Sequence, residues 1–324
     1  MTGSAQLASV LEAGGPELSG QLHRTEGRLA EVAASHGAEL GRHAAGTLSA
    51  GGKRLRPVLV FLCGGNGEGL LPAGVAVELL HMATLVHDDV LDQAALRRGK
   101  PTVFATSGRA AATATGDLLF SRAFAELAST ASQDAVSALS RASSALARGE
   151  LMQRADAWSD SVTPERYLER CELKTASLFS AACRLGAVLG DSPGAEDSLA
   201  SFGRRIGLAF QILDDVLDVS GPSERTGKHR GTDLLDGTVT LPLIVARERD
   251  PELATMDLKQ LVTEPAQAEA VCDRIATTGA LGECRERALI HVAEAKAALG
   301  GAELPKERGK ALDLLADGMV ERYA

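Results

Sequence analysis

Two short segments of this sequence carry the same closely spaced set of aspartates. LVHDDVLD spans residues 85–92, and QILDDVLD spans residues 211–218. In D-D-x-x-D on a helix, the first and third aspartates lie on one face, and the second lies about 100° around the axis. These like charges repel, and the neighbouring leucine, isoleucine and valine side chains draw the helix towards a core. Such a face needs compensating cations, which are either basic side chains or a metal ion.

The carboxylates of both clusters are therefore predicted to bind metal: Asp88, Asp89, Asp92, Asp214, Asp215 and Asp218. Hard oxygen ligands favour Mg²⁺, which is usually shared between one or two carboxylates and substrate phosphates. Calcium is less expected, because the sequence has no D-x-D-x-D-G loop. One cluster alone could be a solvated acidic stripe, but two copies in the most apolar helix of each region favour a site. Their separation far exceeds the period of a helical repeat, about 20–50 residues, so we expect two facing parts of one site.

Three basic segments accompany the acidic ones in this acidic chain. They are GGKRLRP at 51–57, LRRGKPT at 96–102 and TGKHRGTD at 226–233. The three cations of the first segment precede a helix expected to begin at Pro57, where side chains and free N–H groups would converge on an anion. Each segment alone could be solvated surface. The pairing of acidic and basic segments favours a metal-bridged diphosphate, with a second diphosphate in a basic pocket without carboxylates.

Composition indicates the elements that must position these groups. Of 324 residues, 45% are hydrophobic but only 3% are aromatic, so the core must be built mainly from alanine, leucine and valine. Alanine and leucine favour helices, and no alternating pattern predicts a sheet. Helices are expected from Pro72 through the first cluster, from Thr163 as N-cap to Gly190, and from about Asp197 to Ser220. We predict one all-α domain over 1–324, because no low-complexity linker divides the chain.

Charge and cysteine content narrow the class further. The formal net charge of −9 and the few aromatics argue against a nucleic-acid partner. No transmembrane segment is expected, because Glu78 and His81 interrupt the richest apolar stretch. No secretory signal is expected at the N-terminus. The cysteines are odd in number and far apart, which predicts reduced thiols in a cytoplasmic protein: Cys63, Cys171, Cys183, Cys272 and Cys284.

Seven motifs in order give the chain a specific resemblance. They are GGKRLRP, LVHDDVLD, LRRGKPT, GDLLF at 116–120, LKTASLF at 173–179, FQILDDVLD and GKHRGTDL at 227–234. From residue 51 through TLPLI at 240–244, the chain resembles the trans-isoprenyl diphosphate synthases, or polyprenyl synthetases, and most resembles the long-chain bacterial members. The resemblance implies the isoprenoid synthase fold, with helices around a deep central cavity. It also implies head-to-tail condensation of isopentenyl diphosphate with dimethylallyl, geranyl or farnesyl diphosphate.

The resemblance assigns roles to individual residues. Asp88, Asp92 and Asp214 would be direct metal ligands, supported by the other three aspartates, with three Mg²⁺ per site and Mn²⁺ as a substitute. The diphosphate-binding residues would be Arg97, Lys174 and Lys228 for the allylic substrate, and Lys53, Arg56, His81 and Arg98 for isopentenyl diphosphate. Thr175 and Gln211 would stabilise the carbocation, and the departing pyrophosphate would accept the proton. Thr238 stands where many relatives have a lysine, so one allylic-phosphate contact is expected to be missing.

Product length is predicted from the helix that carries Asp88. The growing chain should run towards the N-terminal end of that helix, past Ala83 and Thr84, about one turn deeper than the metal. The next levels present Leu80, Val77 and Ala76, and none of these residues is aromatic. This open path predicts a product of about thirty carbons or more. Phe120 could supply the floor instead, which leaves a twenty-carbon product open.

Three alternatives carry different expectations. A class I terpene cyclase binds one diphosphate and would not need GGKRLRP. A non-catalytic subunit of a heteromeric synthase would usually lose the aspartate motifs, and both are intact. A helical scaffold would leave the six aspartates unexplained. The synthase is therefore favoured; a homodimer is expected, and an unlike partner subunit remains possible.

Overall fold

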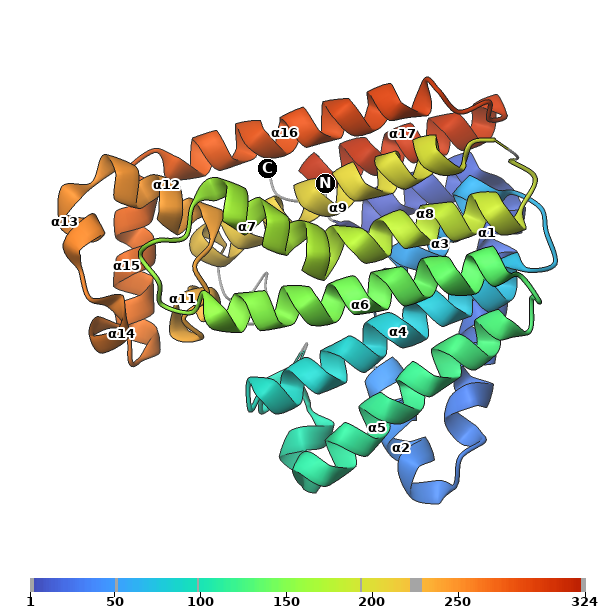
Figure 1. Ribbon diagram of the computed structural model, residues 1–324, viewed down its shortest axis with the longest axis horizontal. Helices are drawn as coiled ribbons and strands as arrows, with labels where there is room; N and C mark the ends of the chain where they lie inside the picture. Colours follow the sequence, from blue (N-terminus) through green and yellow to red (C-terminus); the bar gives the residue numbers. More distant parts are fainter. Residues whose placement is uncertain (1–2, 50–51, 98, 193, 222–228, 322–324) are drawn as a thin grey trace.

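The structure is a computed structural model that describes residues 3–49, 52–97, 99–192, 194–221 and 229–321. Almost all of this part of the chain is helical (Figure 1), so the expected all-α fold is confirmed. The exception is a short antiparallel hairpin of β1 (Leu96–Arg97) and β2 (Lys100–Pro101).

The first half of the chain contributes the helices α1 (Gly3–Ala34), α2 (Ala38–Ser49), α3 (Leu55–Gly64), α4 (Leu70–Leu91), α5 (Val103–Ala128) and α6 (Gln133–Ala155). The middle contributes α7 (Pro164–Cys171), the π-helical turn η1 (Glu172–Ala176), α8 (Ser177–Leu189) and α9 (Glu196–Ser220). The remainder contributes α11 (Thr232–Leu235), α12 (Leu241–Arg249), α13 (Pro251–Thr255), α14 (Leu258–Leu261), α15 (Pro265–Thr277), α16 (Ala280–Leu299) and α17 (Lys306–Glu321).

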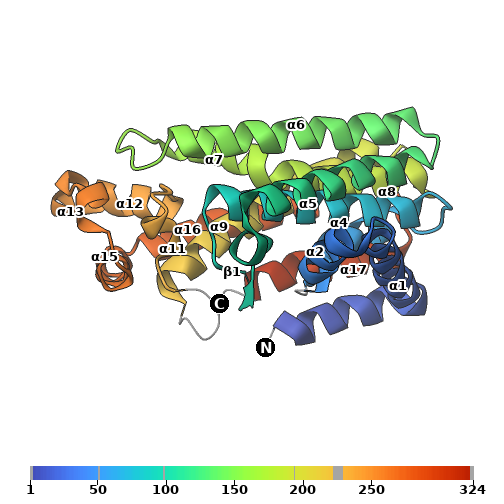
Figure 2. The ribbon, with the colours of Figure 1, turned by 90° about the horizontal axis from the view of Figure 1, so that it is seen from below.

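The long helices pack in layers around α4, α8 and α9. The most extensive packing joins α4 to α5, α9 to α16 and α8 to α9. In Figure 2, α6 and α7 form one outer layer, α1 lies on the opposite side, and the short helices α11–α15 gather at one end. A continuous cluster of buried hydrophobic side chains runs from Val10 to Met319, and it is rich in alanine, leucine and valine as the composition predicts.

Helix α4 is both long and strongly apolar. Its best 18-residue window has a mean hydropathy of 1.5, so by length and composition it could cross a membrane. Glu78 and His81 interrupt this stretch but do not offset the mean hydropathy of the surrounding aliphatic residues. The fold buries 67% of that window, as is typical of the core helix of a soluble protein.

The helix expected over 163–190 is interrupted. Thr163 caps it as predicted, accepting a hydrogen bond from the Arg166 N–H at 3.3 Å, with Pro164 at the first helical position. The π turn then separates α7 from α8, and the Ser177 N–H donates to the Glu172 carbonyl five residues earlier. Such turns are frequent at functional sites. The helix expected from Pro57 begins two residues earlier, at Leu55.

All five cysteines are buried free thiols, as the sequence predicts.

Candidate active site

The aspartates of α4 lie at its C-terminal end, and two of them are paired with arginines. Asp89 is only 5% exposed, and its Oδ1 accepts from Arg97 Nε at 2.6 Å. The Asp92 Oδ1 accepts from an Arg154 guanidinium nitrogen at 2.5 Å. For Asp88, which precedes them on α4, burial raises the pKa to about 6; Lys174 and Arg97 oppose this shift, whereas Glu150 and Asp92 add to it. Burial therefore disfavours the charged form of Asp88 more than the nearby cations favour it.

Helix α6 and the π turn form the wall opposite this cluster. Lys174 Nζ is paired with a Glu150 carboxylate oxygen, and the other oxygen of Glu150 accepts from Arg154 Nε at 2.8 Å. The close approach of α6 to the π turn depends on Gly149, because a Cβ there would lie 2.6 Å from the Lys174 backbone nitrogen. These contacts place Lys174 where its charge acts on Asp88.

The aspartates of α9 have a different set of partners. Asp215 is 4% exposed and accepts from Tyr167 Oη at 2.7 Å and from Gln211 Nε2 at 2.7 Å. Burial raises the pKa of Asp215 well above its usual value, and Asp233 and Asp214 add to this shift. Burial and the neighbouring Asp215 also raise the pKa of Tyr167, which favours its neutral, hydrogen-bond-donating form.

The other two α9 aspartates are more open. Asp214 is exposed, and Asp218 is half-buried. The Asp218 carboxylate accepts from the backbone N–H groups of Thr232 and Asp233, each at 3.2 Å. The segment carrying Lys228 lies outside the described residues, as does Arg98. Thr238 lies beside α6, where its Oγ1 is 3.5 Å from Gln153 Nε2.

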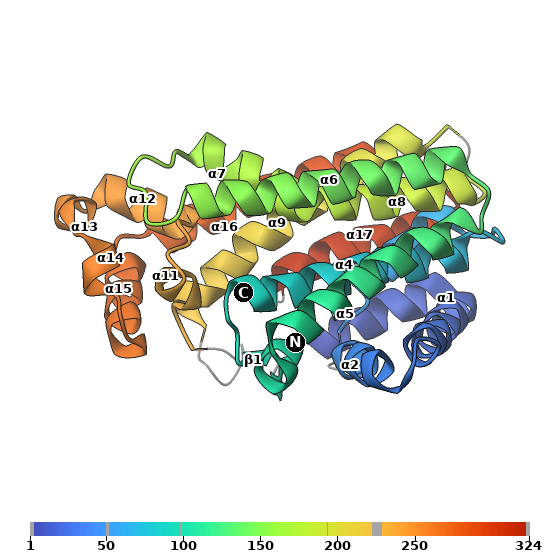
Figure 3. The same cartoon turned by 60° about the horizontal axis from the view of Figure 1, so that its bottom comes forward.

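Consecutive residues of the π turn connect the two clusters. Lys174 faces Asp88 on α4, and the Thr175 hydroxyl donates to Gln211 Oε1 on α9 at 2.7 Å. Gln211 in turn donates to Asp215. In Figure 3, the C-terminal ends of α4 and α9 point towards the same end of the molecule, and α6 runs lengthwise beside these helices. The structure thus brings six predicted residues into one region: Asp88, Asp92, Lys174, Thr175, Gln211 and Asp215.

The basic residues of the first segment separate into different environments. Lys53 and Arg56 are half-buried at the start of α3, and the Arg56 guanidinium lies 4.6 Å from the centroid of the Phe179 ring. His81 is half-buried on α4, against which α3 packs. Arg54 instead points inward, to Glu26 at 2.6 Å and to Glu78 at 2.6 Å. The expectation of three cations on one anion is therefore wrong for Arg54, which links α3 to α1 and α4.

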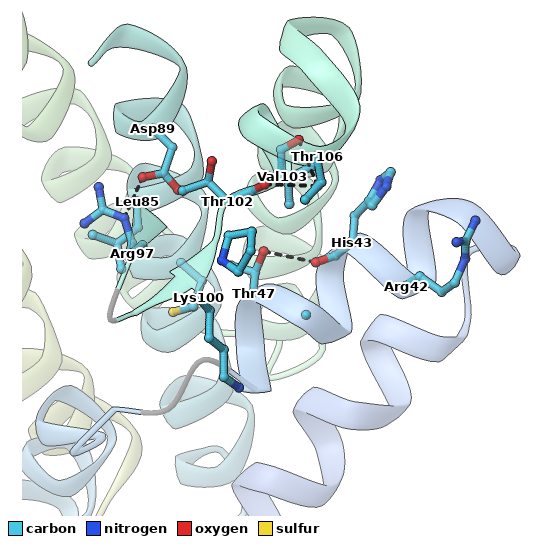
Figure 4. Close-up of a pocket in the computed structure, with 13 residues that line it drawn as sticks. Arg42, His43, Thr47, Leu85, Asp89, Arg97, Lys100, Thr102, Val103 and Thr106 are labelled. Carbon is cyan, nitrogen blue, oxygen red and sulfur yellow. Dashed lines mark hydrogen bonds and ion pairs between the residues drawn. The ribbon is translucent and has the colours of Figure 1, made fainter. Parts of the chain in front are cut away.

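A pocket of about 340 Å³ lies between α2, α4, the β-hairpin and the start of α5. Figure 4 shows the Arg97–Asp89 pair on one wall and His43 and Thr47 of α2 on the other. Its remaining labelled cations, Arg42 and Lys100, extend outward rather than towards a common point (Figure 4). Arg97 therefore lies between this pocket and the Asp88 cluster.

The predicted chain-length residues are more closed than expected. Four of them have no exposed surface and belong to the packed core: Ala83, Leu80, Val77 and Ala76. Thr84 is half-buried, and its hydroxyl donates to the His81 carbonyl at 2.7 Å. Phe120 lies 38% exposed on α5, with its ring 5.3 Å from that of Phe124. Along this face of α4, the side chains of Asp88, Thr84 and His81 are therefore partly exposed, and the next residues towards the N-terminal end of the helix are fully buried.

Sequence reasoning missed three residues that contact the clusters: Glu150, Arg154 and Tyr167. Glu150 and Arg154 are one helical turn apart on α6, a spacing that many surface ion pairs share. Tyr167 offered a better signal, because it is one of two tyrosines in the chain and a buried hydroxyl needs a partner.

The donor set fits a divalent cation. All six candidate ligands are carboxylates, which suit a hard ion, and a bound cation would favour the charged form of Asp88, which burial disfavours. Among the described residues, no three acidic, histidine or cysteine side chains converge into a ready-made cage. Mg²⁺ commonly uses one or two carboxylates and completes its shell with water and substrate phosphates.

Comparison with known proteins defines the class. A family model described as polyprenyl synthetase matches residues 38–278. The chain is 37% identical to heptaprenyl diphosphate synthase component 2 of Geobacillus stearothermophilus, covering 92% of this chain and 94% of that protein. It is 36% identical to the geranylgeranyl diphosphate synthase of Methanosarcina mazei, covering 85% and 87%.

A solved structure extends this likeness to the fold. The polyprenyl synthase of Caulobacter crescentus CB15, complexed with calcium and isoprenyl diphosphate, has a TM-score of 0.89 and 34% identity, covering 97% of this chain and 98% of that one. The chain therefore belongs to the polyprenyl synthetase family. It is a prenyltransferase of the polyprenyl diphosphate synthase type, and enzymes of this family use a divalent metal.

Proposed function

We propose that the chain condenses isopentenyl diphosphate head-to-tail with an allylic diphosphate in a Mg²⁺-dependent reaction, giving an all-E polyprenyl diphosphate. The observation that carries this proposal is the place of the π turn: the charge of Lys174 acts on Asp88, and the next residue, Thr175, is joined by hydrogen bonds through Gln211 to Asp215. It gives one region both carboxylates for metal and cations for diphosphate.

Asp88, Asp92 and Asp214 are proposed as the direct metal ligands. Asp89, Asp215 and Asp218 support them, since each is held by a neighbouring donor. Three bound Mg²⁺ ions, or Mn²⁺ in their place, would neutralise charge developing on the leaving diphosphate and lower the barrier to ionisation.

The cations of the site are proposed to hold the two diphosphates. Lys174, Arg97 and Lys228 would hold the allylic one, with Lys174 exchanging its Glu150 partner for phosphate oxygens. Lys53, Arg56, His81 and Arg98 would hold isopentenyl diphosphate. In this assignment, the basic residues form two groups, one for each substrate diphosphate.

The oxygens of Thr175 and Gln211 are proposed to face the reacting carbons. Breaking the allylic C–O bond leaves a carbocation, which the double bond of isopentenyl diphosphate attacks to form the new C–C bond. Loss of a proton to the departing pyrophosphate then restores an allylic diphosphate. The hydrogen bond between Thr175 and Gln211 fixes the orientation of both dipoles before the charge develops.

The product is proposed to be longer than farnesyl, with about thirty carbons or more. Ala83, Thr84, Leu80 and Val77 carry no aromatic ring, so displacement of packed aliphatic side chains would let the chain pass. The heptaprenyl name of one relative supports this length, whereas the geranylgeranyl name of another supports twenty carbons. Phe120 is exposed, so it would limit the length only where a second copy covers α5.

Ala83→Phe tests this proposal. A ring at that level should shorten the main product by at least one prenyl unit, as measured by mass spectrometry. Unchanged product length would show that the α4 face does not limit elongation.

We further propose that 1–324 is one domain and that the enzyme is a cytoplasmic homodimer. A partner-dependent enzyme is the second candidate, because one relative is named component 2 of a heptaprenyl synthase.

The direct test is incubation of the purified chain with Mg²⁺, isopentenyl diphosphate and farnesyl diphosphate, followed by mass spectrometry. Elongated prenyl diphosphates are expected. Absence of elongation by the chain alone would contradict an autonomous enzyme and favour the partner-dependent form.

A further inference from the structure

Arg154 occupies a distinctive place at the mouth of the candidate site. It projects from α6, and its guanidinium contacts carboxylates on two different elements. One terminal nitrogen lies 2.5 Å from Asp92 Oδ1 at the end of α4, and Nε lies 2.8 Å from Glu150 Oε1 on α6 itself. The side chain therefore crosses from one wall of the site to the other.

The Arg154–Asp92 pair is accessible to solvent. The two side chains are 39% and 29% exposed. Ion pairs this open contribute little stability, typically about 0.2–1 kcal/mol, because water and salt screen them. A more strongly charged cation can therefore replace the guanidinium without opening the fold.

The partner of Arg154 also differs from that of the neighbouring arginine. Arg97 binds Asp89, whose carboxylate is nearly buried, so that pair is protected from exchange. Arg154 binds the last aspartate of the cluster, which is exposed. Of these two pairs, only Arg154–Asp92 thus lies where a cation arriving from solvent meets the carboxylate directly.

We propose that Arg154 is a positioning residue that holds Asp92 in the metal-free protein and is exchanged when a divalent cation binds there. This inference rests on the proposed role of Asp92 as a metal ligand. The released guanidinium keeps its Nε contact with Glu150, so it remains at the mouth. Exchange makes metal binding weaker than an unpaired Asp92 would allow, and it keeps the carboxylate ordered before the metal arrives.

Mn²⁺ binding without substrate, followed by the electron paramagnetic resonance of the free ion, tests this exchange. Arg154→Gln should bind Mn²⁺ about 2- to 5-fold more tightly than the unmodified chain, which is the affinity equivalent of an exposed ion pair. Arg141→Gln is the matched control, because it removes the same charge from the same helix about 20 Å away, at an exposed position. The control should bind as the unmodified chain does.

A second background separates exchange at Asp92 from a general effect of charge. In Asp92→Asn, Mn²⁺ binding should weaken, and adding Arg154→Gln should change it less than 1.5-fold, or about 0.2 kcal/mol. An equal gain in both backgrounds, or no gain in either, would overturn the exchange while leaving the proposed function intact. Unchanged Mn²⁺ affinity in Asp92→Asn alone would overturn the exchange and also the ligand role on which it rests.

Discussion

The two aspartate clusters share the sequence D-D-V-L-D but are held in opposite ways. On α4, the buried Asp89 and the open Asp92 are held by the charged groups of Arg97 and Arg154. On α9, Asp215 is held by the uncharged Tyr167 and Gln211. Asp218 likewise accepts hydrogen bonds from the backbone N–H groups of Thr232 and Asp233.

This difference shows two ways of holding an aspartate: a cation neutralises its charge, whereas a neutral donor only orients its carboxylate. The arginines supply α4 with positive charge, which another cation can replace at the exposed Asp92. Burial, with Asp233 and Asp214, raises the pKa of Asp215 well above its usual value, and the hydrogen bonds from Tyr167 and Gln211 that orient this carboxylate offset only part of that shift. Asp215 is therefore held by neutral donors, whereas Asp92 on α4 is held by a cation that can be exchanged.

The largest expected effect would show whether the clusters are equivalent in catalysis. Asp88→Asn and Asp214→Asn should each lower kcat by about 10³-fold, or about 4 kcal/mol, because each removes a charge that acts on the leaving diphosphate. Steady-state rates with farnesyl diphosphate measure this loss, and circular dichroism checks the fold. If either variant retained a tenth of the activity, the cluster it alters would not be essential to catalysis.

A stability measurement would show how much the charged form of Asp88 on α4 destabilises the folded chain. Folding raises the pKa of Asp88 from 3.8 to about 6, so the folded chain binds this proton more tightly than the unfolded chain. The resulting destabilisation is complete above pH 6 and disappears below about pH 3.8.

Asp88→Asn should therefore stabilise the metal-free chain by about 1–3 kcal/mol at pH 7, and the gain should fall towards zero near pH 4. Urea unfolding at the two pH values measures both. A variant that is less stable at pH 7 would show that the arginines already neutralise the cluster.

The neutral donors of α9 are tested by Tyr167→Phe. The change removes the buried hydrogen bond that the Tyr167 hydroxyl donates to Asp215 Oδ2. We expect it to lower the free energy of unfolding by about 1–2 kcal/mol. Urea unfolding at neutral pH measures it. The cost should be smaller in an Asp215→Asn background, and equal costs in both backgrounds would assign it to packing instead.

The smallest expected effect distinguishes charged from neutral partners directly. Raising salt from about 0.1 M to about 1 M shortens the screening length from about 10 Å to about 3 Å. The destabilisation caused by Arg97→Gln should shrink by a few tenths of a kcal/mol, whereas that of Tyr167→Phe should not change. Equal salt dependence of the two variants would contradict the difference between charged partners on α4 and neutral partners on α9.

The sequence predicts those parts of the site that depend on local pattern. The apolar helix through Asp88 and the capped helix start at Thr163 follow from residue type and spacing, and the structure has both. The direction of Arg54 does not follow, because its left-handed backbone, with φ of 48°, turns this cation inward while its neighbours keep their place.

Long-range partners are the other part that sequence cannot supply. Nothing in the local sequence links Tyr167 to Asp215, or Arg154 to Asp92, because each pair meets only when separate helices pack. The π turn escapes prediction for the same reason. The 3.6-residue pattern continues through it, and the extra residue shows only in the bond from Ser177 to Glu172.

That extra residue makes the site sensitive to chain length. Deleting one residue between Glu172 and Ala176 would restore a regular α-helix, with no loss of backbone hydrogen bonds within the turn. Because the π turn absorbs one extra residue, α7 and α8 would keep their faces, and the change would fall on Lys174 and Thr175, which would lose their places beside Glu150 and Gln211. A one-residue deletion in this stretch is therefore expected to leave the fold in place but to break the link between the two aspartate clusters.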